Sequence, residues 1–207
     1  MEPGHLAGIL LVVGATLFIF AASLPQLYSA WTGDQATYLA TIAAHPTAWL
    51  VCHVCMTAAV LLTAAGLGLL AVQLAQPFAV AAAFAYAAGA AVWCVFEMYR
   101  LSVPPYIARA ITVPLPDWFL PLQDWSGRLF AVYMLTAYLS LAAFGVAILA
   151  GATLPPWSGW LALVFGLAGA VGLASSQPRI KGVSPFEPPV MIHLVPLTLG
   201  VLLLLQG

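Results

Sequence analysis

Residues 48–97 read AWLVCHVCMTAAVLLTAAGLGLLAVQLAQPFAVAAAFAYAAGAAVWCVFE, and this stretch decides the fold. It contains no Asp, Glu, Lys or Arg before Glu97. A helix that crosses a membrane needs about 20 apolar residues, so the stretch is long enough for two such helices. Gln76-Pro77 supplies a turn between them. The apolar residues do not alternate with polar ones, which favours helices over membrane-spanning strands.

The composition of the whole chain agrees with this interpretation. Of its 207 residues, 64% are hydrophobic and only 5% are charged, whereas about 25% of the residues of an ordinary soluble domain are charged. So few charges cannot cover the surface of a soluble enzyme. They also exclude a disordered chain and a nucleic-acid-binding protein with a basic face. The sequence therefore predicts an integral membrane protein whose first partner is the lipid bilayer.

Two further stretches without charge complete the prediction of the fold. One runs between Arg128 and Arg179, and the other follows Glu187. Together with the apolar N-terminal run, they predict an all-α, polytopic helical bundle that forms a single domain over residues 1–207. The six predicted transmembrane helices cover residues 6–25, 48–71, 77–99, 128–150, 157–175 and 188–206.

Six spans put three long loops, at residues 26–47, 100–127 and 176–187, on one side of the membrane. All the basic residues lie on that side, and they are Arg100, Arg109, Arg128, Arg179 and Lys181. The positive-inside rule therefore predicts that the long loops are cytoplasmic and that both termini are outside.

Two of the long loops have patterns of their own. Segment 27–42 carries apolar residues near helical spacing, which predicts a helix lying flat in the membrane interface. Segment 104–121 contains five prolines, so we expect a stiff, extended cover there instead of a long helix. Both segments also suit the aromatic belt that membrane proteins place at the lipid surface.

Two histidines lie inside predicted membrane helices, where ionisable residues are costly and often functional. His53 and His193 each follow the start of their helix by about five residues, so we expect both at a similar depth of roughly 8 Å. Two such imidazoles can ligate a transition metal or a haem b iron. His45 is a candidate third ligand or a residue of the helix cap. The alternative is that each imidazole supports packing through a hydrogen bond.

Cys52-His53-Val54-Cys55 forms a C-x-x-C pattern in the same helix. A thiol relay to a quinone needs a second cysteine pair, and only Cys94 remains. The two thiols therefore either bind Zn or Cu together with His53 or act as small packing residues.

Glu97 and Arg100 close the third predicted helix and share one face of it, because residues three apart lie side by side. Two roles follow for Glu97. It forms a salt bridge with Arg100, or it faces the histidines as a proton carrier and acid–base group.

Asp124-Trp125-Ser126-Gly127-Arg128 opens the fourth predicted helix, where the Asp124 side chain is a candidate cap. Ser126 then lies in the first turn, on the same side of the membrane as His193. A serine and a histidine on neighbouring helices can form a nucleophile–base pair.

This arrangement locally resembles the rhomboid intramembrane serine proteases. Ser126-Gly127 at the start of the fourth helix matches their nucleophile, and His193, Leu197 and Gly200 match the pattern of their last helix. The resemblance covers about twenty residues and implies peptide hydrolysis inside the membrane. This chain departs from the family pattern at Asp124 and Pro196, where the family has glycine.

These observations predict a polar pocket that opens toward the long loops. Its predicted lining is His53, Glu97, Arg100, Ser126, Arg128 and His193. Three functions compete for it. The first is a haem-, metal- or quinone-binding redox subunit, the second is a membrane-embedded hydrolase acting on a lipid or peptide, and the third is a structural or accessory subunit. The third function implies other membrane subunits, or further copies of this chain, as partners.

Overall fold

The computed structural model describes residues 2–110, 115–151, 153–175 and 188–206. These ranges contain helices and no strand, so the all-α prediction is confirmed. Six helical segments within them are long and apolar enough to cross a membrane, which is compatible with a multi-pass membrane protein. They are α1 (Pro3–Ala22), α4 (Pro46–Leu74), α5 (Pro77–Ala110), α6 (Phe119–Ala150), α7 (Pro156–Ser175), and η2 (Pro189–His193) continued by α8 (Leu194–Gln206).

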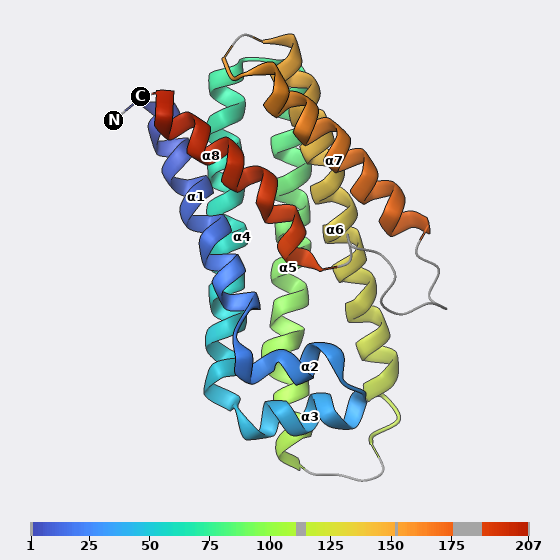
Figure 1. The fold of residues 1–207 in the computed structure, drawn as a ribbon. Coiled ribbons are helices and arrows are strands. Elements are labelled where there is room, and N and C mark those ends of the chain that lie inside the picture. Colours follow the sequence, from blue (N-terminus) through green and yellow to red (C-terminus); the bar gives the residue numbers. More distant parts are fainter. Residues whose placement is uncertain (1, 111–114, 152, 176–187, 207) are drawn as a thin grey trace.

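Contacts join the helices in the order α8, α1, α4, α5, α6, α7, and α8 runs obliquely across the front of the bundle in Figure 1. Both chain ends lie at the same end of the bundle, called the terminal end below. Helices α4, α5 and α6 have 29, 34 and 32 residues, whereas α1 has 20. The three long helices therefore extend past α1 at the opposite end.

Segment 25–44 covers this extension. It consists of η1 (Pro25–Leu27), α2 (Tyr28–Thr32) and α3 (Gln35–Ala44), and the two α-helices lie across the long helices (Figure 1). Asp34 caps α3 by accepting a hydrogen bond of 2.9 Å from the Thr37 backbone nitrogen, and this bond lowers the pKa of the Asp34 carboxyl. The helical prediction for segment 27–42 is thus confirmed, with a break at Gly33.

The predicted bounds were wrong around residues 100–127. Helix α5 continues through Pro104 and Pro105 to Ala110, where we expected an extended cover from residue 104. Helix α6 begins at Phe119, and not at residue 128. Trp118 therefore occupies its N-cap position, and Asp124 lies inside the helix and is not its cap. The predicted cover at 111–114 and the loop at 176–187, with Arg179 and Lys181, lie outside the described residues.

The prolines do not end the helix, because the free-energy cost of a proline inside a helix depends on whether the carbonyl that it frees finds another hydrogen-bond donor. A proline inside a helix lacks the N–H that would bond to the carbonyl four residues earlier. Pro104 therefore frees the carbonyl of Arg100. That carbonyl accepts a hydrogen bond of 2.9 Å from the indole nitrogen of Trp49 on α4. The partner comes from a distant part of the chain, so it cannot be seen in the local sequence.

Close packing of α6 on α7 depends on glycine. A Cβ atom at Gly166 of α7 would lie 2.5 Å from both the Ala142 nitrogen and the Tyr138 carbonyl oxygen of α6. These are backbone atoms, so they cannot move aside without separating the helices. Small residues allow this close approach between membrane helices.

We expect Gly166→Ala to destabilise the protein by about 2–3 kcal/mol, because the added methyl group forces α6 and α7 apart. The matched control is Gly68→Ala on α4, where a Cβ would meet no atom within 4 Å. Thermal unfolding in lipid nanodiscs measures both variants. Equal unfolding temperatures for the two variants would contradict the packing that we describe.

Candidate functional site

A histidine and a carboxylate meet inside the bundle. His53 Nδ1 on α4 and Glu97 Oε2 on α5 are 2.6 Å apart, and each residue is only 1% exposed. The bond uses one polar atom of each side chain. His53 Nε2 and Glu97 Oε1 are also buried and have no hydrogen-bond partner in the described part of the chain. The pair can therefore hold or pass on a proton, and it leaves one atom on each side chain for a further partner.

Glu97 had two predicted roles, and the structure distinguishes between them. Its carboxylate faces His53, and the described residues show no ion pair between Glu97 and Arg100. The arginine instead lies among aromatic rings. Its guanidinium carbon is 5.2, 5.2, 4.9 and 5.5 Å from the ring centres of Trp31, Tyr38, Trp49 and Phe96. We call these four rings the aromatic box. Such cation–π contacts stabilise a guanidinium without a carboxylate.

The aromatic box depends on Trp49. The indole N–H of Trp49 donates to the carbonyl that Pro104 frees, which holds the ring beside the Arg100 side chain. Trp49 also lies one turn before His53, and the two ring centres are 4.2 Å apart. The same tryptophan thus joins the box to the His53–Glu97 pair.

Helices α2 and α3 close the site from outside. Trp31 of α2 stacks on Trp49 with ring centres 5.7 Å apart, and its edge contacts His53 at 5.9 Å. Tyr38 of α3 meets Trp49 edge-on at 5.6 Å. Burial raises the pKa of the Tyr38 hydroxyl, so this group stays protonated at neutral pH. The segment that we expected to lie in the interface is therefore the cover of the buried pair.

The second membrane histidine lies elsewhere. His193 ends η2 and stacks on Phe18 of α1 with ring centres 4.0 Å apart. Phe18 also contacts Trp93, at 5.7 Å, and Trp93 lies one turn before Glu97 on α5. His193 is therefore closer to the membrane centre than His53. The two helices begin at different levels, because α4 starts in the part of the bundle that extends past α1, so a similar distance from the helix start does not give equal depth.

The predicted metal ligands do not gather. No ring contact or hydrogen bond joins His53 to His193 among the described residues. His45 is exposed at the α3–α4 junction, where its carbonyl accepts from the Trp49 backbone nitrogen at 3.0 Å, which supports the cap alternative. In the described part of the chain, no three His, Cys, Asp or Glu side chains are arranged to hold a metal ion.

Two further predicted site residues lie on α6. The hydroxyl of Ser126 is buried and donates to the Gln123 carbonyl at 2.8 Å, and not to a histidine. Both ring nitrogens of His193 lack a hydrogen-bond partner among the residues that the structure describes, so the predicted Ser126–His193 pair is not formed. Arg128 is exposed and does not line the buried site.

The cysteines take part in packing. The buried thiol of Cys52 donates to the Ala21 carbonyl of α1 at 3.2 Å, which joins α4 to α1. Cys55 is half-buried, and Cys52, Cys55 and Cys94 are all free thiols. The contact with Ala21 also places the end of α1 at the level of His53.

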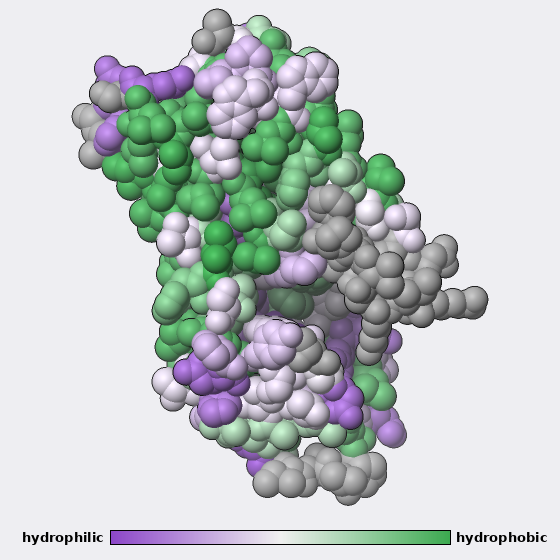
Figure 2. Space-filling view, in the orientation of Figure 1, coloured by the Kyte–Doolittle hydropathy of each residue, from purple (hydrophilic) through white to green (hydrophobic). Residues whose placement is uncertain are grey.

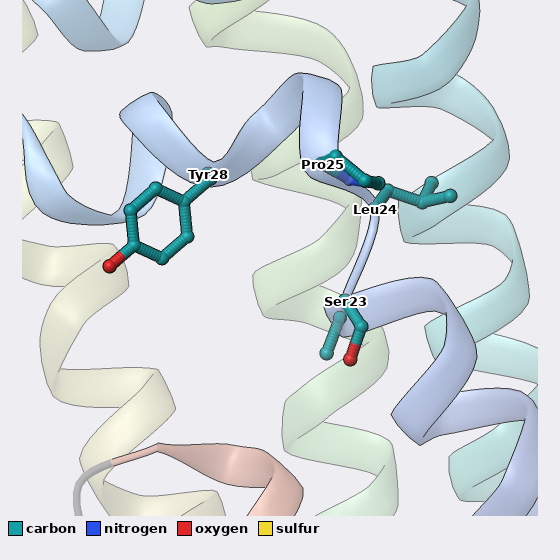
Figure 3. Close-up of a pocket in the computed structure, with 5 residues that line it drawn as sticks. Ser23, Leu24, Pro25 and Tyr28 are labelled. Atoms are coloured by element: carbon teal, nitrogen blue, oxygen red, sulfur yellow. The ribbon is translucent and has the colours of Figure 1, made fainter.

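A pocket of about 420 Å³ opens where α1 passes into α2. Ala22, Ser23, Leu24, Pro25 and Tyr28 line it, and Figure 3 shows the Tyr28 ring extending toward α6, with Ser23 apart from it at the end of α1. In Figure 2 the surface is hollowed between the apolar upper part and the cover formed by α2 and α3.

Neither histidine lines the pocket, but residues that contact each histidine follow or precede its lining by one helical turn. Ala22 is one helical turn past Phe18, which stacks on His193. Tyr28 is one turn before Trp31, which contacts His53. No sequence pattern indicated the pocket, because it forms between a helix end and a helix that folds back across the bundle.

No protein-family model matches the chain, and no curated protein or solved structure matches it either. The site must therefore be understood from its own geometry.

The link between Pro104 and Trp49 can be tested by combining substitutions. We expect Trp49→Phe to lower the free energy of unfolding by about 1–2 kcal/mol, because it leaves the Arg100 carbonyl without a donor. In Pro104→Ala protein the restored backbone N–H takes that carbonyl, so the same substitution should cost about 1 kcal/mol less. Chemical unfolding in mixed micelles gives both costs. An identical cost in the two backgrounds would show that the indole does not replace the lost helix bond.

A double-mutant cycle tests the partner of Glu97. We expect His53→Ala and Glu97→Ala to show a coupling energy of about 1.5–3 kcal/mol, as for a hydrogen bond to a charged group. The matched cycle with Arg100→Ala and Glu97→Ala should show a smaller coupling, because the arginine contacts aromatic rings. If the second coupling exceeds the first, Glu97 is paired with Arg100, as the salt-bridge alternative holds.

Proposed function

We propose that this chain is a membrane-embedded binding protein for a quinone-class lipid, and that the His53–Glu97 pair hydrogen-bonds to the lipid head group and exchanges protons with it. One observation carries the proposal. His53 Nε2 and Glu97 Oε1 are buried and have no partner within the described protein, and a pocket opens at Tyr28, one helical turn before the Trp31 ring that contacts His53. Buried polar atoms without partners mark places where a ligand or water binds.

The position of the pair along the helices suits such a ligand. Helix α1 is about 30 Å long and ends at Ala22, and Glu97 lies about 30 Å along α5 from Pro77. The hydrocarbon core of a bilayer is also about 30 Å thick. A membrane that covers α1 therefore ends near the pair and the pocket. A quinone fits this boundary, because its tail stays in the hydrocarbon while its ring carries two polar carbonyls.

The side chains around the pair match the chemistry of a quinone ring. Trp31 and Tyr28, which are both partly exposed, offer aromatic faces near the pocket for stacking on a flat ring. His53 Nε2 can accept a proton from a quinol hydroxyl while the Nδ1 proton passes to Glu97. No net charge then remains on the imidazole, which matters in apolar surroundings.

The proposal also has consequences for partners and orientation. A quinone changes its redox state only with an electron donor or acceptor, so the fitting role is that of a subunit beside such a protein. The positive-inside expectation places the pocket at the cytoplasmic surface.

Haem or transition-metal binding is the second candidate function. His53 has Nδ1 held by a carboxylate and Nε2 free, which is the usual state of a ligating histidine. His193 and His45 do not join it, so His53 is its single candidate ligand of the three. An absorbance spectrum and a metal analysis of the purified protein test this candidate. The hydrolase alternative has less support, because Ser126 has no histidine partner.

We expect the purified protein in nanodiscs to bind a short-tailed ubiquinone or menaquinone analogue saturably. His53→Ala should raise the dissociation constant about 10-fold or more, which corresponds to the loss of one hydrogen bond. His45→Ala is the matched control, because this histidine is exposed and lies outside the pair. A titration followed by tryptophan fluorescence measures all three proteins.

Two results would contradict the proposal. One is the absence of saturable binding to the unaltered protein. The other is an equal dissociation constant for His53→Ala and His45→Ala. A Soret band that is lost in His53→Ala would replace the proposal with the haem alternative.

A further inference from the structure

Beyond the His53–Glu97 pair, a line of buried polar atoms leads toward the middle of the bundle. Its members share two properties, since each is fully buried and none has a hydrogen-bond partner among the described residues. They are Nε1 of Trp93, both ring nitrogens of His193, and the hydroxyl oxygens of Tyr133 and Tyr86. The proposed function does not use them.

These groups follow one another through direct contacts. Trp93 lies one turn before Glu97 on α5, and its ring is 4.6 Å from that of Tyr133 on α6. The Tyr133 ring is 6.5 Å from that of Tyr86, whose hydroxyl is directed toward the Tyr133 hydroxyl and toward Thr63 of α4. His193 joins the line through Phe18, which contacts Trp93. The line therefore extends about 16 Å along α5 from Glu97.

So many unpartnered groups would be costly in a dry interior. A buried hydroxyl or amide-like group without a hydrogen bond costs roughly 1–3 kcal/mol by protein mutational data. Proteins usually satisfy such groups with internal water, which needs two to four polar neighbours. Here the imidazole, indole and phenol groups supply both donors and acceptors.

We infer that a file of bound water molecules runs from the His53–Glu97 pair past Trp93 and His193 to Tyr133 and Tyr86, and that this water hydrogen-bonds to the buried polar groups along the line. Water is thus the ligand of this inner site. The inference does not depend on the quinone proposal, because it holds for any ligand at the pocket.

The file has one open end. On the terminal side of Tyr86, α1 packs tightly on α4. A Cβ at Gly66 of α4 would lie 2.8 Å from the Leu11 side chain and 3.1 Å from the Leu11 backbone nitrogen of α1. Helices this close leave no room for water between them. The file therefore opens toward α2 and α3 and ends inside the membrane, so it is not a channel.

Hydrogen–deuterium exchange at the Trp93 indole tests the water file. The full chain is placed in nanodiscs and transferred to D₂O, and the indole signal is assigned by its loss in Trp93→Phe. We expect the Trp93 N–H to exchange much faster than the backbone N–H groups of α5 around it. Those backbone groups stay in helix hydrogen bonds and report any opening of the bundle. Equal rates for the indole and these backbone groups would overturn the inference, because exchange would then require unfolding.

A pair of tyrosine variants gives an independent test. Tyr133→Phe removes one hydroxyl from the file and should slow exchange at Trp93 roughly 10-fold, as expected for the loss of one hydrogen bond. Tyr138→Phe is the matched control, because Tyr138 is as deeply buried on α6 but contacts Phe165 of α7. Equal slowing by both variants would overturn the inference.

The change in melting temperature on Tyr133→Phe has opposite signs for a hydrated line of groups and for a dry one. If Tyr133 binds water, Tyr133→Phe lowers the melting temperature, because the water loses a partner. If its hydroxyl is buried dry, the same change raises the melting temperature by removing an unsatisfied group. A rise would overturn the inference, and a fall together with slower exchange at Trp93 supports it.

Discussion

The hydrogen bond between His53 and Glu97 sets the arrangement of the bundle at its covered end. A lone carboxylate among apolar helices is too costly to keep, so Glu97 needs a partner from a neighbouring helix. The imidazole on α4 supplies it at 2.6 Å, which fixes the register between α4 and α5. Because these helices are antiparallel, Trp49, one turn before His53, then lies beside Arg100, one turn after Glu97. The aromatic box and its cover follow from that register.

Two layers of buried polar groups result, an outer one around Arg100 and an inner one around Trp93. They differ in whether the protein supplies their partners. In the outer layer the protein provides the partners, since Trp49 bonds the carbonyl freed by Pro104 and four aromatic rings surround Arg100. In the inner layer Trp93, His193 and Tyr133 have no partner within the described residues. The proposed ligand and water sites therefore lie inward of the box. This contrast also explains why α2 and α3 fold over the bundle, because they separate the inner layer from the head-group region.

The helices pack in different ways at the two ends of the bundle. At the terminal end, glycines let helices touch through their backbones, and the packing leaves little room for polar groups. At the covered end, large aromatic side chains pack between the helices and cover the buried His53–Glu97 pair. The proposed site, which opens toward the covered end, agrees with this difference. It matches the uneven distribution of charge, in which all the basic residues were assigned to the long-loop side.

The sequence by itself determined the class of fold and the number of apolar helices, because apolar length and the absence of charge are local properties of the chain. It also identified His53, Glu97, Arg100 and His193 as unusual residues for their surroundings. Only the tertiary structure decided how they pair. Glu97 pairs with His53 on another helix and not with Arg100, which is nearer to it in the sequence. Helix α5 continues through Pro104 because Trp49, 51 residues before Arg100 in the chain, bonds the Arg100 carbonyl that the proline frees. The cost of a buried polar atom depends on its partner, and the partners here come from other helices.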